Sequence, residues 1–251
     1  SKIFAPQRGK YELSVRGGTH KNRWTLTIKN AQPDDRGNYT CQVNTEPVMA
    51  KTAELHLKVP PTVSRTTPSV VEVREGQNVT LACHAEGSPP PTVIWRRNDR
   101  QIIRYHGNGG FGSSVFHGPD LSLVGVSRRH MAEYVCVASN GIPPEESWSI
   151  KLLVTFPPHA LAKASMVSAR RGQMARLVCD VEAWPRPEVT WSRGGEPLYE
   201  NDHVAIHHSA SGAFTTVHML DLRHFSPEDD PAVYRCEARN ENGAHYASIR
   251  L

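Results

Sequence analysis

The sequence contains none of the short motifs that mark common catalytic and metal-binding sites. No Cys-x-x-Cys pair, no Gly-x-Ser-x-Gly turn and no glycine loop ending in Gly-Lys-Ser/Thr occurs in its 251 residues. These absences exclude the zinc ribbon, the nucleophile elbow and the phosphate-binding loop. We therefore expect a protein that is not an enzyme, has no metal or cofactor, and takes no small-molecule substrate.

Long apolar runs and an excess of charge of one sign are also missing. No apolar stretch approaches 18 residues and no signal peptide is visible, so we expect no membrane span within these residues. Lysine and arginine number 29 against 25 acidic residues, which gives a net charge of +4. A balance this mild argues against a nucleic-acid partner.

Histidine is plentiful, with 13 residues, but its spacing does not suit a metal site. His207 and His208 are neighbours on a predicted strand, where successive side chains point to opposite faces. His203 and His207 have no Cys or carboxylate at ligand spacing. The glycines between residues 107 and 112 open no helix and are interpreted as a flexible strand connection.

A pattern of Tyr-x-Cys occurs three times, ending at Cys41, Cys136 and Cys236. In the second and third copies an upstream Cys precedes a Trp by 12 residues, at Cys83 and at Cys179. A repeat of about 100 residues built on Cys, Trp and Tyr-x-Cys is typical of immunoglobulin-like sandwiches. The predicted fold is therefore all-β: tandem immunoglobulin-like sandwiches of the I-set or C2-like kind.

The repeat also predicts two disulfides. In such a sandwich the Cys of strand B bonds the Cys of strand F, and the strand C Trp packs against the bridge. We expect Cys83 to pair with Cys136 and Cys179 to pair with Cys236. The alternatives, buried free thiols or metal ligands, leave the equal Trp offsets unexplained.

Cys41 does not fit this scheme. In this kind of sandwich its strand B partner should lie roughly 50 to 60 residues upstream. Only 40 residues precede Cys41 in this sequence. Trp24 begins an alternating segment, Trp24 to Ile28, that reads as strand E. We expect the first domain to be truncated at its N-terminus, lacking strands A, B and C, with Cys41 unpaired here. A reactive free thiol is the alternative interpretation.

Proline pairs divide the chain into three predicted domains, at residues 1–59, 60–156 and 157–251. Pro60-Pro61 and Pro157-Pro158 make short, stiff junctions because proline fixes φ and restricts the residue before it. Within the last two domains the predicted strands are 70–74, 78–85, 92–97, 132–139, 147–154, 175–181, 188–192, 214–222, 233–239 and 246–251. Helices should be nearly absent.

The turn before each Tyr-x-Cys differs in one position. An Asp stands four residues before the Tyr in the first and third copies, at Asp35 and Asp230, where it commonly holds the corner. The second copy has His130 there instead. We expect the second corner to be held in another way.

The disulfides imply an oxidising compartment. Two glycosylation sequons agree with this, Asn38-Tyr39-Thr40 and Asn78-Val79-Thr80. Asn78 should point outward on strand B, opposite to the face of Cys83, whereas Asn38 lies next to a tyrosine corner. We expect an extracellular protein, secreted or held at the plasma-membrane surface by an anchor that is not in this chain.

Several segments resemble one family in detail. They run from Val126 to Pro144, Val73 to Val79, Val93 to Arg97, Cys41 to Pro47 and Val59 to Pro61. Across essentially the whole chain, the sequence resembles the IgLON, lachesin and Dpr-interacting-protein family of neural adhesion molecules. Within this family, the sequence most resembles the nematode neuronal member with three immunoglobulin domains.

The resemblance implies a function. Members of the family are neuronal surface proteins that bind themselves or related immunoglobulin-superfamily proteins, homophilically or heterophilically, and they act in cell adhesion, axon guidance and synapse recognition. Binding uses the GFCC′C″ sheet of the first domain. The matching positions in this sequence are Gln42, Asn44, Thr45, Val48 and Met49, with Ile3 and Phe4 in C″. Strand C and most of C′ have no counterpart, so part of that face cannot be carried over.

A cluster of arginines offers an alternative function. It comprises Arg96, Arg97, Arg100, Arg104, Arg128 and Arg129. Such a cluster could attract heparan sulfate or another sulfated glycan through its charge. The interleaved Asp99 and Glu133 weaken this interpretation, and a solvated basic face is the simpler one.

Overall fold

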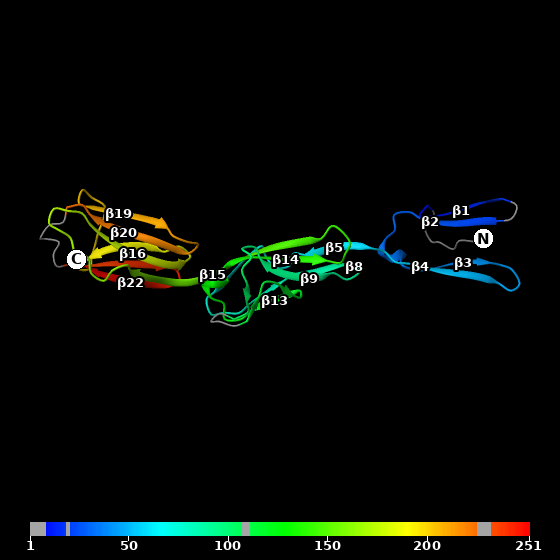
Figure 1. Ribbon diagram of the computed structural model, residues 1–251, viewed down its shortest axis with the longest axis horizontal. Coiled ribbons are helices and arrows are strands. Elements are labelled where there is room, and N and C mark those ends of the chain that lie inside the picture. The colour runs from blue at the N-terminus through cyan, green and yellow to red at the C-terminus, as the bar shows by residue number, and fades with distance from the viewer. Residues whose placement is uncertain (1–8, 19–20, 107–110, 225–231) are drawn as a thin grey trace. The chain divides into compact units, whose positions relative to one another are not determined.

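The computed structural model of the chain describes residues 9–18, 21–106, 111–224 and 232–251 (Figure 1). Within these ranges the regular structure is β-strand with two short 3-10 helices, η1 (Pro33–Asp35) and η2 (Arg128–His130), and there is no α-helix. The all-β prediction is confirmed.

The described residues form two compact units. The first contains the chain up to Thr62 together with Ala85–Thr92 and Ala138–Glu146, and the second contains the remainder. The second unit therefore holds most of the predicted second domain together with the third. The division into three domains stays a prediction.

The first unit carries two antiparallel hairpins, which Figure 1 shows as separate pairs of strands. Strands β1 (Tyr11–Gly18) and β2 (Lys21–Ile28) make one, and β3 (Gly37–Val43) and β4 (Met49–Leu55) make the other. Among the described residues from 9 to 58, Asp35 alone is buried. Apolar side chains on these hairpins are instead exposed, namely those of Leu13, Val15, Trp24, Leu26, Val43 and Met49.

The remaining strands follow in order along the chain. They are β5 (Val59–Ser64), β6 (Val70–Arg74), β7 (Val79–Ala82), β8 (His84–Ser88), β9 (Thr92–Arg97), β10 (Ile103–Arg104), β11 (Gly112–Ser113), β12 (Phe116–His117), β13 (Asp120–Leu123), β14 (Ala132–Ser139), β15 (Glu146–Ala162), β16 (Ala175–Trp184), β17 (Glu188–Arg193), β18 (Glu196–Pro197), β19 (Val204–Ala210), β20 (Thr215–Leu222), β21 (Val233–Asn240) and β22 (Gly243–Arg250).

Strand β15 is longer than predicted. It pairs in parallel with β6 as far as Thr155 and antiparallel with β16 at Phe156 and again from His159 onward, with a register shift between Phe156 and His159. Pro157 and Pro158 lie inside this shift, where the ladder is already interrupted. The missing proline N–H groups therefore cost no regular ladder bond, and the strand continues through the predicted junction.

Both predicted disulfides are present. Cys83 bonds Cys136 with their Cα atoms 6.4 Å apart, and Cys179 bonds Cys236 at 6.5 Å. Trp95 and Trp191 are fully buried, and Trp191 pairs with Cys236 across the neighbouring strands. Cys41 is an exposed free thiol.

The tyrosine corner is built alike in the first two copies. The hydroxyl of Tyr39 donates to the carbonyl oxygen of Asp35 at 2.7 Å, and that of Tyr134 donates to the carbonyl oxygen of His130 at 2.9 Å. The two bonds tie β3 to η1 and β14 to η2, the 3-10 helices that precede these strands. The tyrosine side chain, and with it the rotation of the strand, is therefore fixed.

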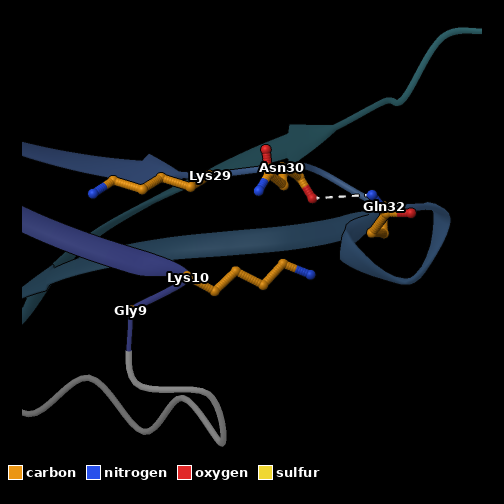
Figure 2. A pocket seen from close by; sticks show the side chains of 5 residues that line it. All are labelled: Gly9, Lys10, Lys29, Asn30 and Gln32. Atoms are coloured by element: carbon orange, nitrogen blue, oxygen red, sulfur yellow. Dashed lines mark hydrogen bonds between the residues drawn. The ribbon is translucent and has the colours of Figure 1, made fainter.

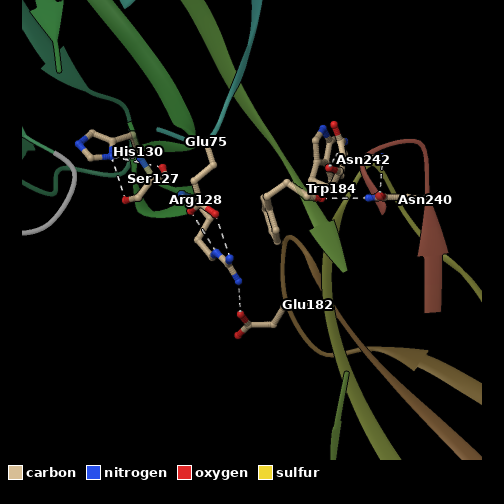
Figure 3. Close-up of polar contacts among 9 residues, drawn as sticks. Glu75, Ser127, Arg128, His130, Glu182, Trp184, Asn240 and Asn242 are labelled. Atoms are coloured by element: carbon tan, nitrogen blue, oxygen red, sulfur yellow. Dashed lines mark hydrogen bonds and ion pairs between the residues drawn. The ribbon is translucent and has the colours of Figure 1, made fainter. Parts of the chain in front are cut away.

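Asp35 and His130 hold these corners in the same way: each side chain accepts a hydrogen bond from the backbone amide three residues before it. The carboxylate of Asp35 accepts from the amide of Gln32 at 2.6 Å, and mainly for this reason its pKa is lowered to about 2. In the second corner, Nδ1 of His130 accepts from the amide of Ser127 at 3.0 Å (Figure 3). Burial lowers the pKa of His130, which favours the neutral ring that this acceptor role needs. Asp230 lies outside the described residues.

An asparagine lies four residues after the second Cys in both later copies, and it makes the same kind of bonds. Asn240 Nδ2 donates to the carbonyl oxygens of Phe156 at 3.0 Å and Pro185 at 3.1 Å. Asn140 Nδ2 donates to those of Val59 and Pro89, both at 2.8 Å. Each asparagine therefore ties the carbonyl that precedes a Pro-Pro pair to a proline turn.

Arg128 joins three groups of the second unit. Its guanidinium contacts Glu75 at 3.0 Å and Glu182 at 2.8 Å (Figure 3). It also lies 4.0 Å from the centre of the Phe156 ring. Phe156 is fully buried. The charge of Arg128 is thus neutralised on two sides while its flat face covers an aromatic ring.

His218 lies on the core side of β20. It pairs with Cys179 on β16 and with His208 on β19, and the two imidazoles stack with their centres 5.9 Å apart. Its side chain also shares a 2.9 Å hydrogen bond with Thr216. Burial, assisted by repulsion from His208, lowers the pKa of His218 to about 4.

Replacing Asn240 by Ala removes the donor that satisfies both the Phe156 and Pro185 carbonyls. We expect the free energy of unfolding to fall by about 1–3 kcal/mol, because two partly buried acceptors lose their partner. Chemical denaturation of the chain measures it. Asn98→Ala, which removes one exposed hydrogen bond, is the matched control and should change stability by less than about 0.5 kcal/mol. Equal losses in the two variants would contradict this role.

The stability of the chain should fall as pH is lowered from 6.5 to 4 because of His218. In this pH range His218 of the unfolded chain, with a pKa near 6.5, is protonated. His218 of the folded chain, with a pKa of about 4, is still neutral. The full contribution is present above pH 6.5. Allowing for partial screening by water, the loss should be about 1–2 kcal/mol.

Denaturation curves across this pH range, for the parent chain and for His218→Gln, isolate the effect. The variant should show a flatter pH dependence than the parent, whereas the exposed control His117→Gln should follow the parent. Parallel curves for all three proteins would show that His218 does not titrate as inferred.

Cys41 should be the one thiol that reacts in the folded chain, because the other four sulfurs are disulfide-bonded. Iodoacetamide added without reductant or denaturant should label one site per molecule, at Cys41, as read by peptide mass spectrometry. Cys41→Ser should take no label. Labelling at any other cysteine would contradict the assigned pairing.

Candidate protein-binding surface

The β3–β4 hairpin presents two faces of different chemistry. Its register pairs Asn38 with Glu54, Thr40 with Thr52 and Gln42 with Ala50. Because side chains alternate along a strand, these six residues share one face, which we call the outer face. Tyr39, Cys41 and Val43 lie on the opposite, inner face.

The outer face is exposed and almost uncharged. The hydroxyls of Thr40 and Thr52 are 2.8 Å apart across the strands, and Gln42 Nε2 donates to Asn44 Oδ1 at 3.3 Å. Its single charged residue, Glu54, lies at the end near the tyrosine corner. Such a face offers amides and hydroxyls that fix the register of a partner at little desolvation cost.

The loop after β3 is held by its own bonds. Thr45 N donates to the Val43 carbonyl at 2.9 Å, and the Thr45 hydroxyl donates to the Pro47 carbonyl at 2.8 Å. Val48, at the end of this loop, has 59% of its surface exposed. The hairpin therefore carries an apolar side chain at one end of a polar strand face.

The structure does not bring all the predicted binding residues together. Met49 pairs with Val43, which places it on the inner face with Cys41 and away from Gln42. Gln42 and Asn44 interact directly, with Thr45 and Val48 in the adjoining loop. Ile3 and Phe4 lie outside the described residues. These assignments remain predictions.

Sequence reasoning missed Ala50 and Thr52, which share the outer face. Alternation along β3 was enough to locate Gln42. The residues of β4 that face the same way can be assigned only from the pairing register, which depends on the geometry of the loop. The polar and small residues at alternate positions from Ala50 to Glu54 are the signal that could have indicated them.

Both sequon asparagines are exposed. Asn38 lies on the outer face. Asn78 accepts a 2.8 Å hydrogen bond from the amide of Gly125 through its side-chain oxygen. The nitrogen of Asn78, to which a glycan is attached, takes no part in that bond.

Two of the six arginines in the cluster are already paired with acidic residues of the chain. Arg97 is buried, pairs with Asp99 at 2.7 Å and donates to the Arg129 carbonyl. Arg128 is occupied by Glu75 and Glu182. The sulfated-glycan alternative is therefore not supported.

A shallow hollow lies beside the first corner, lined by Gly9, Lys10, Lys29, Asn30 and Gln32 (Figure 2). None of these five lining residues is acidic, and Lys10 pairs with Asp35 at 2.8 Å. Within the described residues, no group of three or more His, Cys, Asp or Glu side chains is placed to hold a metal ion. Among those same residues, no helix is both long enough and apolar enough to cross a membrane.

Family models match almost the entire chain. The immunoglobulin I-set domain model matches residues 6–59 and 158–251, and an immunoglobulin domain model matches residues 60–140. The matches cover the hairpins of the first unit as well as both disulfide-bonded segments.

Two curated relatives and one solved structure resemble the chain over nearly its full length. Protein amalgam of Drosophila melanogaster is 32% identical over 247 residues, which are 96% of this chain and 72% of amalgam. Lachesin of Schistocerca americana is 31% identical, over 95% of this chain and 67% of lachesin.

The structure is a crystal structure of Dpr2 Ig1-Ig2 in complex with DIP-Theta Ig1-Ig3. It matches with a TM-score of 0.84 and 32% identity, over 95% of this chain and 80% of the matched chain. The chain thus belongs to the immunoglobulin I-set proteins, within the neural immunoglobulin cell adhesion family of amalgam and lachesin, whose members are extracellular.

Proposed function

We propose that the chain recognises a second immunoglobulin-superfamily protein, a copy of itself or a relative, through the outer face of the β3–β4 hairpin. The supporting observation is the exposed strand face of Thr40 and Gln42 with Val48 at its end. The similarity to a structure whose title describes an immunoglobulin complex favours the same class of partner. The role is binding at the neuronal surface, without a catalytic step.

Binding would divide between apolar and polar contacts. In protein interfaces a few apolar or aromatic anchors supply most of the affinity, while surrounding polar groups exclude water and fix orientation. Val48 is the apolar anchor of this surface. Gln42 and Asn44, already joined by a hydrogen bond, present a side-chain amide network to the partner.

The position of Met49 gives the proposal an internal contrast. Val48 and Met49 are adjacent and similarly exposed, but Met49 shares the inner face with Cys41. If binding uses the outer face, a charge at the two positions should have unequal effects.

Val48→Asp should weaken self-association of the chain, or its binding to an immunoglobulin-superfamily ectodomain, by at least about tenfold, the effect of losing an apolar anchor. Sedimentation velocity and binding to a panel of such ectodomains are the measurements. Met49→Asp should have a smaller effect.

The matched control is Val70→Asp, at a valine on β6 with 51% exposure. It introduces the same charge on a strand of the second unit and should leave binding unchanged. Binding that survives Val48→Asp, or that falls equally with Val70→Asp, would remove the outer face from the interface.

A further inference from the structure

The sequon asparagine Asn38 shares the outer face with Thr40 and Gln42. We propose that an N-linked glycan on Asn38 occupies this face and prevents the docking of a partner. This inference rests on the proposed function. It adds a means of regulation, because the fraction of molecules that carry a glycan on Asn38 would set the fraction that cannot bind a partner.

The direction of Asn38 follows from its neighbours in sequence. The Tyr39 side chain is held toward the other face because its hydroxyl donates to the Asp35 carbonyl at 2.7 Å. Alternation then places Asn38 and Thr40 on the outer face, and the 2.8 Å contact between the Thr40 and Thr52 hydroxyls agrees. The strand cannot turn Asn38 inward without breaking the corner.

The spacing makes the overlap unavoidable. Asn38 and Gln42 are four residues apart on one strand, about 13 Å at the usual strand rise. Two sheets packed face to face are separated by only about 10 Å. A branched, hydrated glycan attached at Asn38 would have to fill that gap, so a partner sheet could not approach Gln42 closely.

The second sequon provides a built-in comparison. Asn78 lies in the second unit, and its side-chain oxygen is bonded to Gly125. A glycan there belongs to a surface that the proposed function does not use. Removing each glycan separately therefore distinguishes blocking of the outer face from a general effect of glycosylation on solubility.

The experiment uses the full 251-residue chain secreted from cells that add N-glycans, with Cys41→Ser in every protein to prevent disulfide-linked dimers. Peptide mass spectrometry after enzymatic deglycosylation measures occupancy at Asn38. We expect Asn38 to carry a glycan on part or all of the molecules. An unmodified Asn38 throughout would overturn the proposal.

Self-association is then measured by sedimentation, with a second copy of the chain as the probe. Asn38→Gln should associate at least about tenfold more tightly than the glycosylated parent. Asn78→Gln removes only the other glycan, on a residue outside the outer face, so it should behave as the parent does.

The outcomes separate this inference from the proposed function. Equal association of Asn38→Gln and the parent would overturn the glycan block and leave the function standing. Loss of the Asn38→Gln association on adding Val48→Asp would support both. If Asn38→Gln neither self-associates nor binds any member of the panel of immunoglobulin-superfamily ectodomains, the proposed function would be contradicted, and the inference would fall with it.

Discussion

The fixed rotation of the Tyr-x-Cys strand is the constraint on which the proposed binding surface depends. In the second copy the Tyr-x-Cys strand is held at two points of one face, by the hydroxyl of Tyr134 at the corner and by the disulfide of Cys136. Every alternate residue must then face outward. In the first copy the Tyr39 bond does this without a disulfide, so Gln42 keeps its outward direction although Cys41 is free.

The corners show that geometry, and not residue type, is what the fold requires. Asp35 and His130 both accept from the amide three residues before them, one with a carboxylate oxygen and one with an imidazole nitrogen. The carboxylate works because it stays ionised, and the imidazole works because burial keeps it neutral. Two opposite protonation behaviours therefore support one backbone turn.

The sequence predicted the parts that depend on spacing within one strand or between repeats. The 12-residue offset from Cys to Trp was enough to assign both disulfides and both buried tryptophans, and alternation was enough to orient Gln42. It could not place Met49, because a residue next to a loop takes its face from the pairing register. It also missed the bonds of Asn240, which join backbone atoms from three distant segments.

The continuity of β15 ties the folding of neighbouring segments together. This one strand is a partner of β6 before the proline pair and of β16 after it. Melting either sheet would strip hydrogen bonds from a strand that the other sheet still needs, as in arrays where adjacent repeats share an interface energy. A force that pulls along the chain at this point would act on a hydrogen-bonded strand and not on a flexible linker. The proline pair would therefore pass the force from one set of strands to the next.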